Sequence, residues 1–176
     1  MVQLYSLMWI LAAFFGVMGL IRGWSREVIA TAGIVLGMFG LFQFDAILRG
    51  TVLLNFPLDQ VFFIQVLIFT VIVFFAYRNR MFLPEGRTSE LGMQNSVLGG
   101  LVGCFNGYLI GGTLWYFMDI NEYPLAPYIL APAANSPSAQ NIGTMPMVLL
   151  GGGVAGSAEL LPIAVIALFL LVLIVL

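Results

Sequence analysis

The sequence has little of what a soluble enzyme needs. It contains no histidine, no lysine and one cysteine, and only 8% of its 176 residues are charged, whereas a soluble domain usually carries about 25% charged residues. Without histidine, most acid–base and transition-metal chemistry loses its usual side chain, and the lone Cys104 provides neither an intramolecular disulfide nor a zinc site. The six arginines are too few and too scattered for a nucleic-acid-binding face. We therefore expect no metal, no cofactor and no nucleic-acid partner.

Hydrophobic residues, by contrast, make up 61% of the chain and gather in long runs. A helix needs about 20 apolar residues, with a range of roughly 17–25, to cross a hydrocarbon core about 30 Å thick. The runs are Leu4–Ile21, Val28–Phe44, Val61–Tyr77, Val97–Met118 and Leu160–Leu176. They predict an all-α integral membrane helical bundle with four core transmembrane helices and a fifth helix at the C-terminal end.

Composition divides the chain into three parts. Residues 1–118 are predicted to form the four-helix transmembrane core, residues 119–159 a proline- and glycine-rich loop that is extracytoplasmic or interfacial, and residues 160–176 a transmembrane or interfacial helix. The proline density of the middle part excludes a continuous helix, and its apolar residues indicate contact with the membrane surface or a partner. The stretch 147–157 is too short to span and is a candidate re-entrant segment.

Arginine placement predicts the orientation. Five arginines follow the first or the third run: Arg22, Arg26, Arg78, Arg80 and Arg87. Only Arg49 lies between the second and third runs. Under the positive-inside rule, residues 22–27 and 78–95 face the cytoplasm and the N-terminus is extracytoplasmic. No positive charge precedes the first run, which is the wrong order for a cleaved signal peptide, so we expect that run to remain as a helix of the inner (cytoplasmic) membrane.

Glycines recur on single helix faces. In the fourth run they repeat every four residues, at Gly99, Gly103, Gly107 and Gly111; further spaced glycines are Gly33 and Gly37 in the second run, and Gly19 and Gly23 around the end of the first. Because lipid gives helices no hydrophobic reason to associate, close backbone approach has to supply the attraction. The glycine faces therefore predict helix packing, either inside this chain's own bundle or against another protein.

A compact charged turn, Arg22-Gly23-Trp24-Ser25-Arg26-Glu27, joins the first two runs. The spacing of Arg22 and Arg26 predicts that one helical turn presents both to the same side. Glu27 can pair with either arginine, or cap the start of the second helix, whose positive end suits a carboxylate. The turn is either a topology anchor, since an arginine near a helix end reaches the interface at low cost, or a site for a lipid phosphate or a partner carboxylate.

Few polar side chains lie inside the runs. Asn106 lies mid-helix beside the glycine face, and we expect it to hydrogen-bond a neighbouring helix. The acids at predicted helix ends, where we expect solvation, are Asp45, Asp59, Asp119 and Glu122. No acid lies deep inside a run, which argues against a proton or ion relay.

Catalytic motifs are absent from the sequence. Ser157, Glu159 and Cys104 have no histidine partner, and the glycines at 151–153 are not followed by the lysine of a phosphate-binding loop. We therefore expect that the protein is not an enzyme.

The charged turn and the helices around it resemble the colicin V production (CvpA) protein family. The signature is Gly-x-x-Arg-Gly-x-x-Arg-Glu, formed by Gly19, Arg22, Gly23, Arg26 and Glu27. The fourth run, which opens Asn95-Ser96-Val97-Leu98-Gly99-Gly100, is similar to that family's last core helix, and the segment containing Tyr123-Pro124 and Ala131-Pro132 is similar to its proline-bearing C-terminal part. The likeness covers about residues 4–135.

The resemblance implies a small four-helix inner-membrane protein linked to toxin secretion and envelope processes. The chain departs from the family pattern by its fifth run, and by Asn106 and Tyr108 in a region where family members often carry a basic residue.

Three functions fit these observations. The family implies a non-catalytic accessory role in envelope or secretion processes, exerted through helix–helix association. A structural subunit of a larger membrane complex, respiratory or photosynthetic, fits because the chain has little extramembrane mass and several small-residue faces. A small channel or transporter would need homo-oligomers around a pore. The expected partners are membrane lipids and either other membrane-protein subunits or further copies of the chain.

Overall fold

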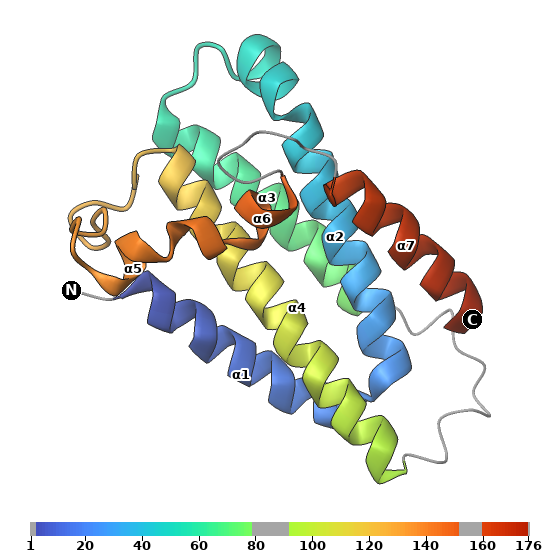
Figure 1. Cartoon of the computed structure of the whole chain (residues 1–176). Helices are drawn as coiled ribbons and strands as arrows, with labels where there is room; N and C mark the ends of the chain where they lie inside the picture. Colours follow the sequence, from blue (N-terminus) through green and yellow to red (C-terminus); the bar gives the residue numbers. More distant parts are fainter. Residues whose placement is uncertain (1–2, 79–91, 152–159, 176) are drawn as a thin grey trace.

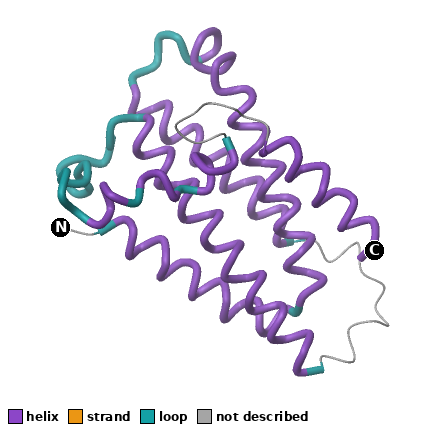
Figure 2. The backbone as a smooth tube through the Cα atoms, in the orientation of Figure 1, coloured by secondary structure: helices purple, strands orange, loops and turns teal. Residues whose placement is uncertain are grey.

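The computed structural model describes residues 3–78, 92–151 and 160–175, and the regular elements in this part of the chain are helices (Figures 1 and 2). Four helices are long and apolar enough to cross a membrane: α1 (Leu4–Arg22), α2 (Trp24–Ile47) with the π-helical turn η1 (Leu48–Val52) that continues it, α3 (Leu58–Tyr77) and α4 (Met93–Ile120). The all-α membrane bundle predicted from the sequence is therefore confirmed.

A fifth apolar helix and three short helical elements follow α4. The short ones are α5 (Pro137–Gln140), η2 (Ile142–Thr144) and α6 (Pro146–Leu150), and the fifth run forms α7 (Leu160–Val175). At a rise of 1.5 Å per residue, the 16 residues of α7 reach about 24 Å, which is less than a hydrocarbon core of roughly 30 Å. Helix α7 packs along α2 (Figure 1).

The long helices extend beyond the apolar runs because they include polar flanking turns. The second run was predicted from Val28 to Phe44, whereas α2 begins at Trp24 and ends at Ile47. Glu27 and Asp45 are therefore helical residues. An unbroken helix satisfies its backbone hydrogen bonds internally, which favours continuing it through the membrane boundary.

Helix α4 lies at the centre of the bundle. It runs alongside α1 and also contacts α2, α3 and α6 (Figure 1). Helix α2 packs in turn against α3 and α7, so the order in space differs from the order in the chain. The core between α3 and α4 includes an edge-to-face pair of aromatic rings, Phe69 and Phe117, whose centroids are 5.8 Å apart.

A single residue, Gly23, joins α1 to α2. Its backbone has φ 83° and ψ 163°, a conformation that is open almost only to glycine. The expectation that one helical turn presents Arg22 and Arg26 to the same side is wrong, because the helix breaks between them. Arg22 ends α1, whereas Arg26 lies in the first turn of α2 and is exposed.

The glycines of α4 lie against the backbone of α1. A Cβ atom built on Gly103 would lie 2.4 Å from the carbonyl oxygen of Phe15 and 3.0 Å from the Cα of Gly19. One built on Gly107 would lie 2.6 Å from the carbonyl oxygen of Leu11. The two helices thus approach each other at a distance that no side chain at these positions allows, which increases the van der Waals contact along them.

The other predicted packing glycines also face helices of this chain. A Cβ on Gly99 would lie 2.4 Å from the carbonyl oxygen of Gly19, and one on Gly111 would touch Met8. On α2, a Cβ built on Gly33 would lie 2.6 Å from the Cβ of Ala76 in α3, and a Cβ built on Gly37 would lie 2.8 Å from the side chain of Ile72 in α3. The predicted packing glycines therefore lie in two helix contacts, that of α1 with α4 and that of α2 with α3.

The proline-rich segment after α4 packs in part on the chain's own helices, a location that the sequence did not suggest. Met145 and Met147 are buried, and a Cβ on Gly112 of α4 would lie 2.2 Å from Pro146 of α6. The hydroxyl of Ser138 accepts a hydrogen bond of 3.2 Å from the backbone N–H of Tyr5. The candidate re-entrant stretch falls partly on α6, and its residues 152–157 lie outside the described part of the chain.

Candidate functional site

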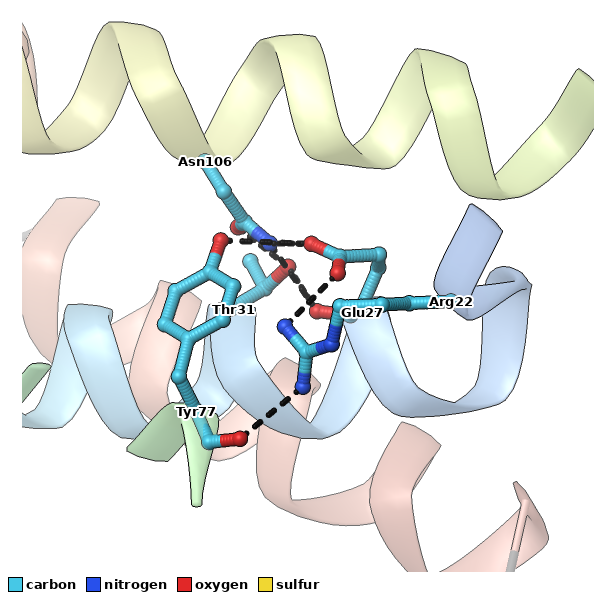
Figure 3. Close-up of polar contacts among 5 residues, drawn as sticks. All are labelled: Arg22, Glu27, Thr31, Tyr77 and Asn106. Carbon is cyan, nitrogen blue, oxygen red and sulfur yellow. Dashed lines mark hydrogen bonds and ion pairs between the residues drawn. The ribbon is translucent and has the colours of Figure 1, made fainter. Parts of the chain in front are cut away.

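A buried polar cluster at one end of the bundle takes at least one side chain from each of the four long helices (Figure 3). Its members are Arg22 of α1, Glu27 and Thr31 of α2, Tyr77 of α3 and Asn106 of α4. The chain positions them by ending α1 and α3 and beginning α2 at this same end, while α4 passes alongside. We call this group the four-helix polar cluster.

Glu27 is the centre of the four-helix polar cluster, and its side chain has 0% exposure. Its Oε1 accepts a hydrogen bond of 2.9 Å from Nη1 of Arg22, which is also an ion pair. Its Oε2 accepts one of 2.9 Å from Nδ2 of Asn106 and one of 3.2 Å from the hydroxyl of Tyr77. Both carboxylate oxygens are therefore engaged by three other helices.

Asn106 hydrogen-bonds a neighbouring helix, as the sequence predicted, and that helix is α2. Besides the Glu27 carboxylate, its Nδ2 donates to the Glu27 backbone carbonyl at 3.1 Å. Its Oδ1 accepts from the hydroxyl of Thr31 at 2.7 Å. Within the described residues, no buried side-chain nitrogen or oxygen lacks a hydrogen-bond partner, so the cluster does not incur the cost of an unpaired polar group in a low-dielectric interior.

Arg22 connects α1 to the end of α3. Its Nη2 donates to the backbone carbonyl of Tyr77 at 3.0 Å, and its guanidinium lies 4.4 Å from the centre of the Tyr77 ring. Tyr77 is the last residue of α3, where carbonyl groups have no partner inside the helix and a cation is favoured. The arginine is 18% exposed, so it neutralises Glu27 from the rim of the cluster and caps a helix with the same head group.

The start of α2 is capped from α4. The backbone N–H of Trp24 donates to Oδ1 of Asn95 at 3.0 Å, which satisfies one of the free donors of the first helical turn. Asn95 lies 71 residues further along the chain, so no local pattern at the start of α2 identifies it as the cap.

A second polar cluster lies at the opposite end of α2 and is formed by Asp45, Arg49, Gln65 and Asn121. Nε of Arg49 lies 3.0 Å from both carboxylate oxygens of Asp45, and its Nη2 donates to Oδ1 of Asn121 at 3.0 Å. Nε2 of Gln65 donates to Asp45 at 2.7 Å. The expectation that Asp45 is merely solvated is therefore wrong: its carboxylate joins α2 to α3.

Asp119, in the last turn of α4, also accepts a hydrogen bond from a side chain. It accepts a hydrogen bond of 3.0 Å from the hydroxyl of Tyr123, which in turn accepts one of 3.3 Å from Nε1 of Trp115. Burial, together with the hydrogen bond to Asp119, raises the pKa of Tyr123 to about 12. The hydroxyl is protonated at physiological pH, as an ordinary tyrosine is, and donates to Asp119.

The structure brings together only some of the residues that the sequence singled out. Arg22 and Glu27 pair, with Gly23 between their helices, while Arg26 is exposed. The residues that the motif missed are Thr31, Tyr77, Asn95, Asp45, Arg49 and Asn121. Only the Asp45–Arg49 pair carries a local signal, since its spacing of four is that of a helical ion pair.

These features define a multi-pass helical membrane protein. A family model described as "Colicin V production protein" matches residues 6–143, which is most of the chain. The chain therefore belongs to the colicin V production protein family. No curated protein and no solved structure matches it.

Proposed function

We propose that this chain is a non-catalytic accessory protein of the cytoplasmic membrane that serves envelope or secretion processes by presenting a rigid four-helix surface to other membrane proteins. The family supports the biological setting. The observation that carries the non-catalytic part is the state of Glu27, whose two carboxylate oxygens are both occupied by donors from other helices.

A carboxylate in this state suits a structural role better than proton transfer. A general base or a relay acid needs an oxygen within reach of a substrate or a water chain, whereas Glu27 is fully buried and meets Arg22, Tyr77 and Asn106. Its hydrogen bonds hold four helices in register, which is what a scaffold requires.

The outward face of α1 supports association with other membrane proteins. Four large apolar side chains lie along it at spacings of three or four residues, and each is more than half exposed: Ile10, Phe14, Val17 and Ile21. A partner helix can pack on this face without displacing α4, which covers the opposite side of α1.

Co-purification tests the proposal. The tagged chain, expressed in its own host and solubilised in mild detergent, is expected to enrich envelope or secretion proteins over an equally expressed, unrelated four-helix membrane protein, as quantified by mass spectrometry. Stoichiometric recovery of redox or pigment subunits would contradict the proposal and favour a structural role in a respiratory or photosynthetic complex. Flux through proteoliposomes that is abolished by Glu27→Gln would contradict the non-catalytic role.

We also propose that the end of the bundle that carries Arg22, Arg26 and Arg78 faces the cytoplasm, with Arg49 at the other end. In a Cys104→Ala background, Thr51→Cys is expected to react with a membrane-impermeant maleimide in right-side-out spheroplasts, and Arg26→Cys only after permeabilisation. Residues 26 and 51 are both exposed in the structure, so labelling depends on which side of the membrane the reagent can reach. The reverse labelling pattern would show that the N-terminus lies in the cytoplasm.

A further inference from the structure

An apolar groove of about 410 Å³ runs between α2 and α3. Its walls include Gly37, Gly40, Phe44 and Leu48 of α2, with Ile68 and Ile72 of α3. Both helices are membrane spans, and Phe44 at the rim is 55% exposed. The groove therefore opens toward the hydrocarbon of the bilayer.

Gly40 lines this groove at a point where its helix face is open. A Cβ atom built on it would meet nothing within 4 Å, unlike the glycines at the helix contacts. Gly40 thus serves no close approach between helices of the described chain, and a side chain placed there would enter the groove without disturbing the core.

The length of the groove matches one leaflet. From Leu36 to Leu48 the helix advances 12 residues, or about 18 Å at 1.5 Å per residue, and half of a hydrocarbon core of roughly 30 Å is about 15 Å. A groove of this length, with apolar walls, suits a hydrocarbon chain that extends through one leaflet.

The groove ends near the second polar cluster, whose four side chains do not line it. Leu48 precedes Arg49, and Gln65 lies one helical turn before Ile68 on the other wall. Arg49 uses Nε for Asp45 and Nη2 for Asn121 and Gln65, while its Nη1 makes no hydrogen bond to the described residues. The arginine is 26% exposed, at the end of the membrane span. One edge of this partly exposed guanidinium, which is paired with Asp45 through Nε, therefore has no hydrogen-bond partner among the described residues.

We propose that this groove binds one anionic phospholipid, with an acyl chain along α2 and α3 and the phosphate on the Nη1 edge of Arg49. Guanidinium N–H groups are suited to phosphate oxygens, and a basic side chain near the membrane surface favours anionic lipid. Asp45 occupies only the Nε edge of the guanidinium, so it orients Arg49 without covering the edge that the phosphate needs. The inference is independent of the proposed accessory function.

Native mass spectrometry of the purified full chain tests the site with dioleoyl phosphatidylglycerol and dioleoyl phosphatidylcholine, which share their acyl chains. The anionic lipid is expected to be retained more than the zwitterionic one, by at most about fivefold, the effect of one unpaired arginine at the surface, because Asp45 offsets part of the charge of Arg49. Arg49→Gln should remove this preference. Gly40→Phe should lower the retention of both lipids severalfold, because the ring fills the groove.

Leu67→Phe is the matched control, since Leu67 is 64% exposed on α3 outside the groove. This substitution should not change the retention of either lipid. Equal retention of the two lipids by the unmodified chain would overturn the proposal, as would a Gly40→Phe variant that melts normally and still binds both. Displacement of the anionic lipid by millimolar inorganic phosphate would show that phosphate alone suffices and that the groove takes no acyl chain. A dimer lost on Gly40→Phe would identify a second copy as the occupant instead.

Discussion

Replacing Glu27 with alanine is expected to lower the free energy of unfolding by roughly 3 kcal/mol, the lower end of the range for breaking a buried ion pair. The lower end applies because Arg22 is 18% exposed and is partly solvated once its partner is gone. The substitution also removes the acceptor that Asn106 and Tyr77 share. The measurement is equilibrium unfolding of the purified protein in mixed micelles with increasing sodium dodecyl sulfate, followed by circular dichroism.

Two variants separate the ion pair from general damage. Arg22→Met combined with Glu27→Met removes both charges, and it should be more stable than Glu27→Ala because no unpaired charge remains. Arg26→Met removes an exposed arginine of the same motif and should change stability by less than about 0.5 kcal/mol. Wild-type stability of Glu27→Ala would refute a central role for this carboxylate in the four-helix polar cluster.

Gly103→Leu is expected to separate α1 from α4 and to destabilise the protein by roughly 3 kcal/mol or more, at or beyond the usual range for overpacking. The reason is that the Cβ atom alone would lie 2.4 Å from a backbone carbonyl oxygen of Phe15, and backbone cannot move aside as a side chain can. Thermal melting and size-exclusion chromatography in detergent would measure the effect.

Gly40→Leu is the matched control for this prediction, because it introduces the same side chain into a membrane helix where a Cβ meets nothing within 4 Å. It should melt within a few degrees of the unmodified chain. If Gly103→Leu behaved like Gly40→Leu, the close contact between α1 and α4 would have no part in stability.

Polar clusters and glycine contacts contribute differently to this bundle. Hydrogen bonds between membrane helices average only about 0.6 kcal/mol each, so the value of the four-helix polar cluster lies mainly in specificity: a shift of one helix would leave Glu27 or Asn106 unpaired in a low-dielectric interior. The glycine contacts set how closely the helices approach and supply van der Waals attraction. The polar contacts therefore determine which helices pack side by side, and the glycine contacts determine how closely those helices approach.

Much of the fold could be predicted because it depends on local composition. A run such as Leu4–Ile21 is long and apolar wherever it is placed in space, so α1 follows from the bilayer's thickness alone. The ends of α2 were less predictable, because the turns containing Glu27 and Asp45 read as polar and yet are helical. A turn between the first two helices was predicted over residues 22–27, but its confinement to Gly23 was not, since glycine permits but does not require its unusual backbone conformation.

By itself, the sequence determined that this is a helical membrane protein with four spans and identified its family. Tertiary structure alone decided that Glu27 meets Tyr77, 50 residues away, and Asn106, 79 residues away. It also decided that the glycines of α4 face α1, and that a groove beside Arg49 stays open. The physical reason is that hydropathy acts on each segment separately, whereas a polar partner or a close backbone contact exists only after several helices have packed together.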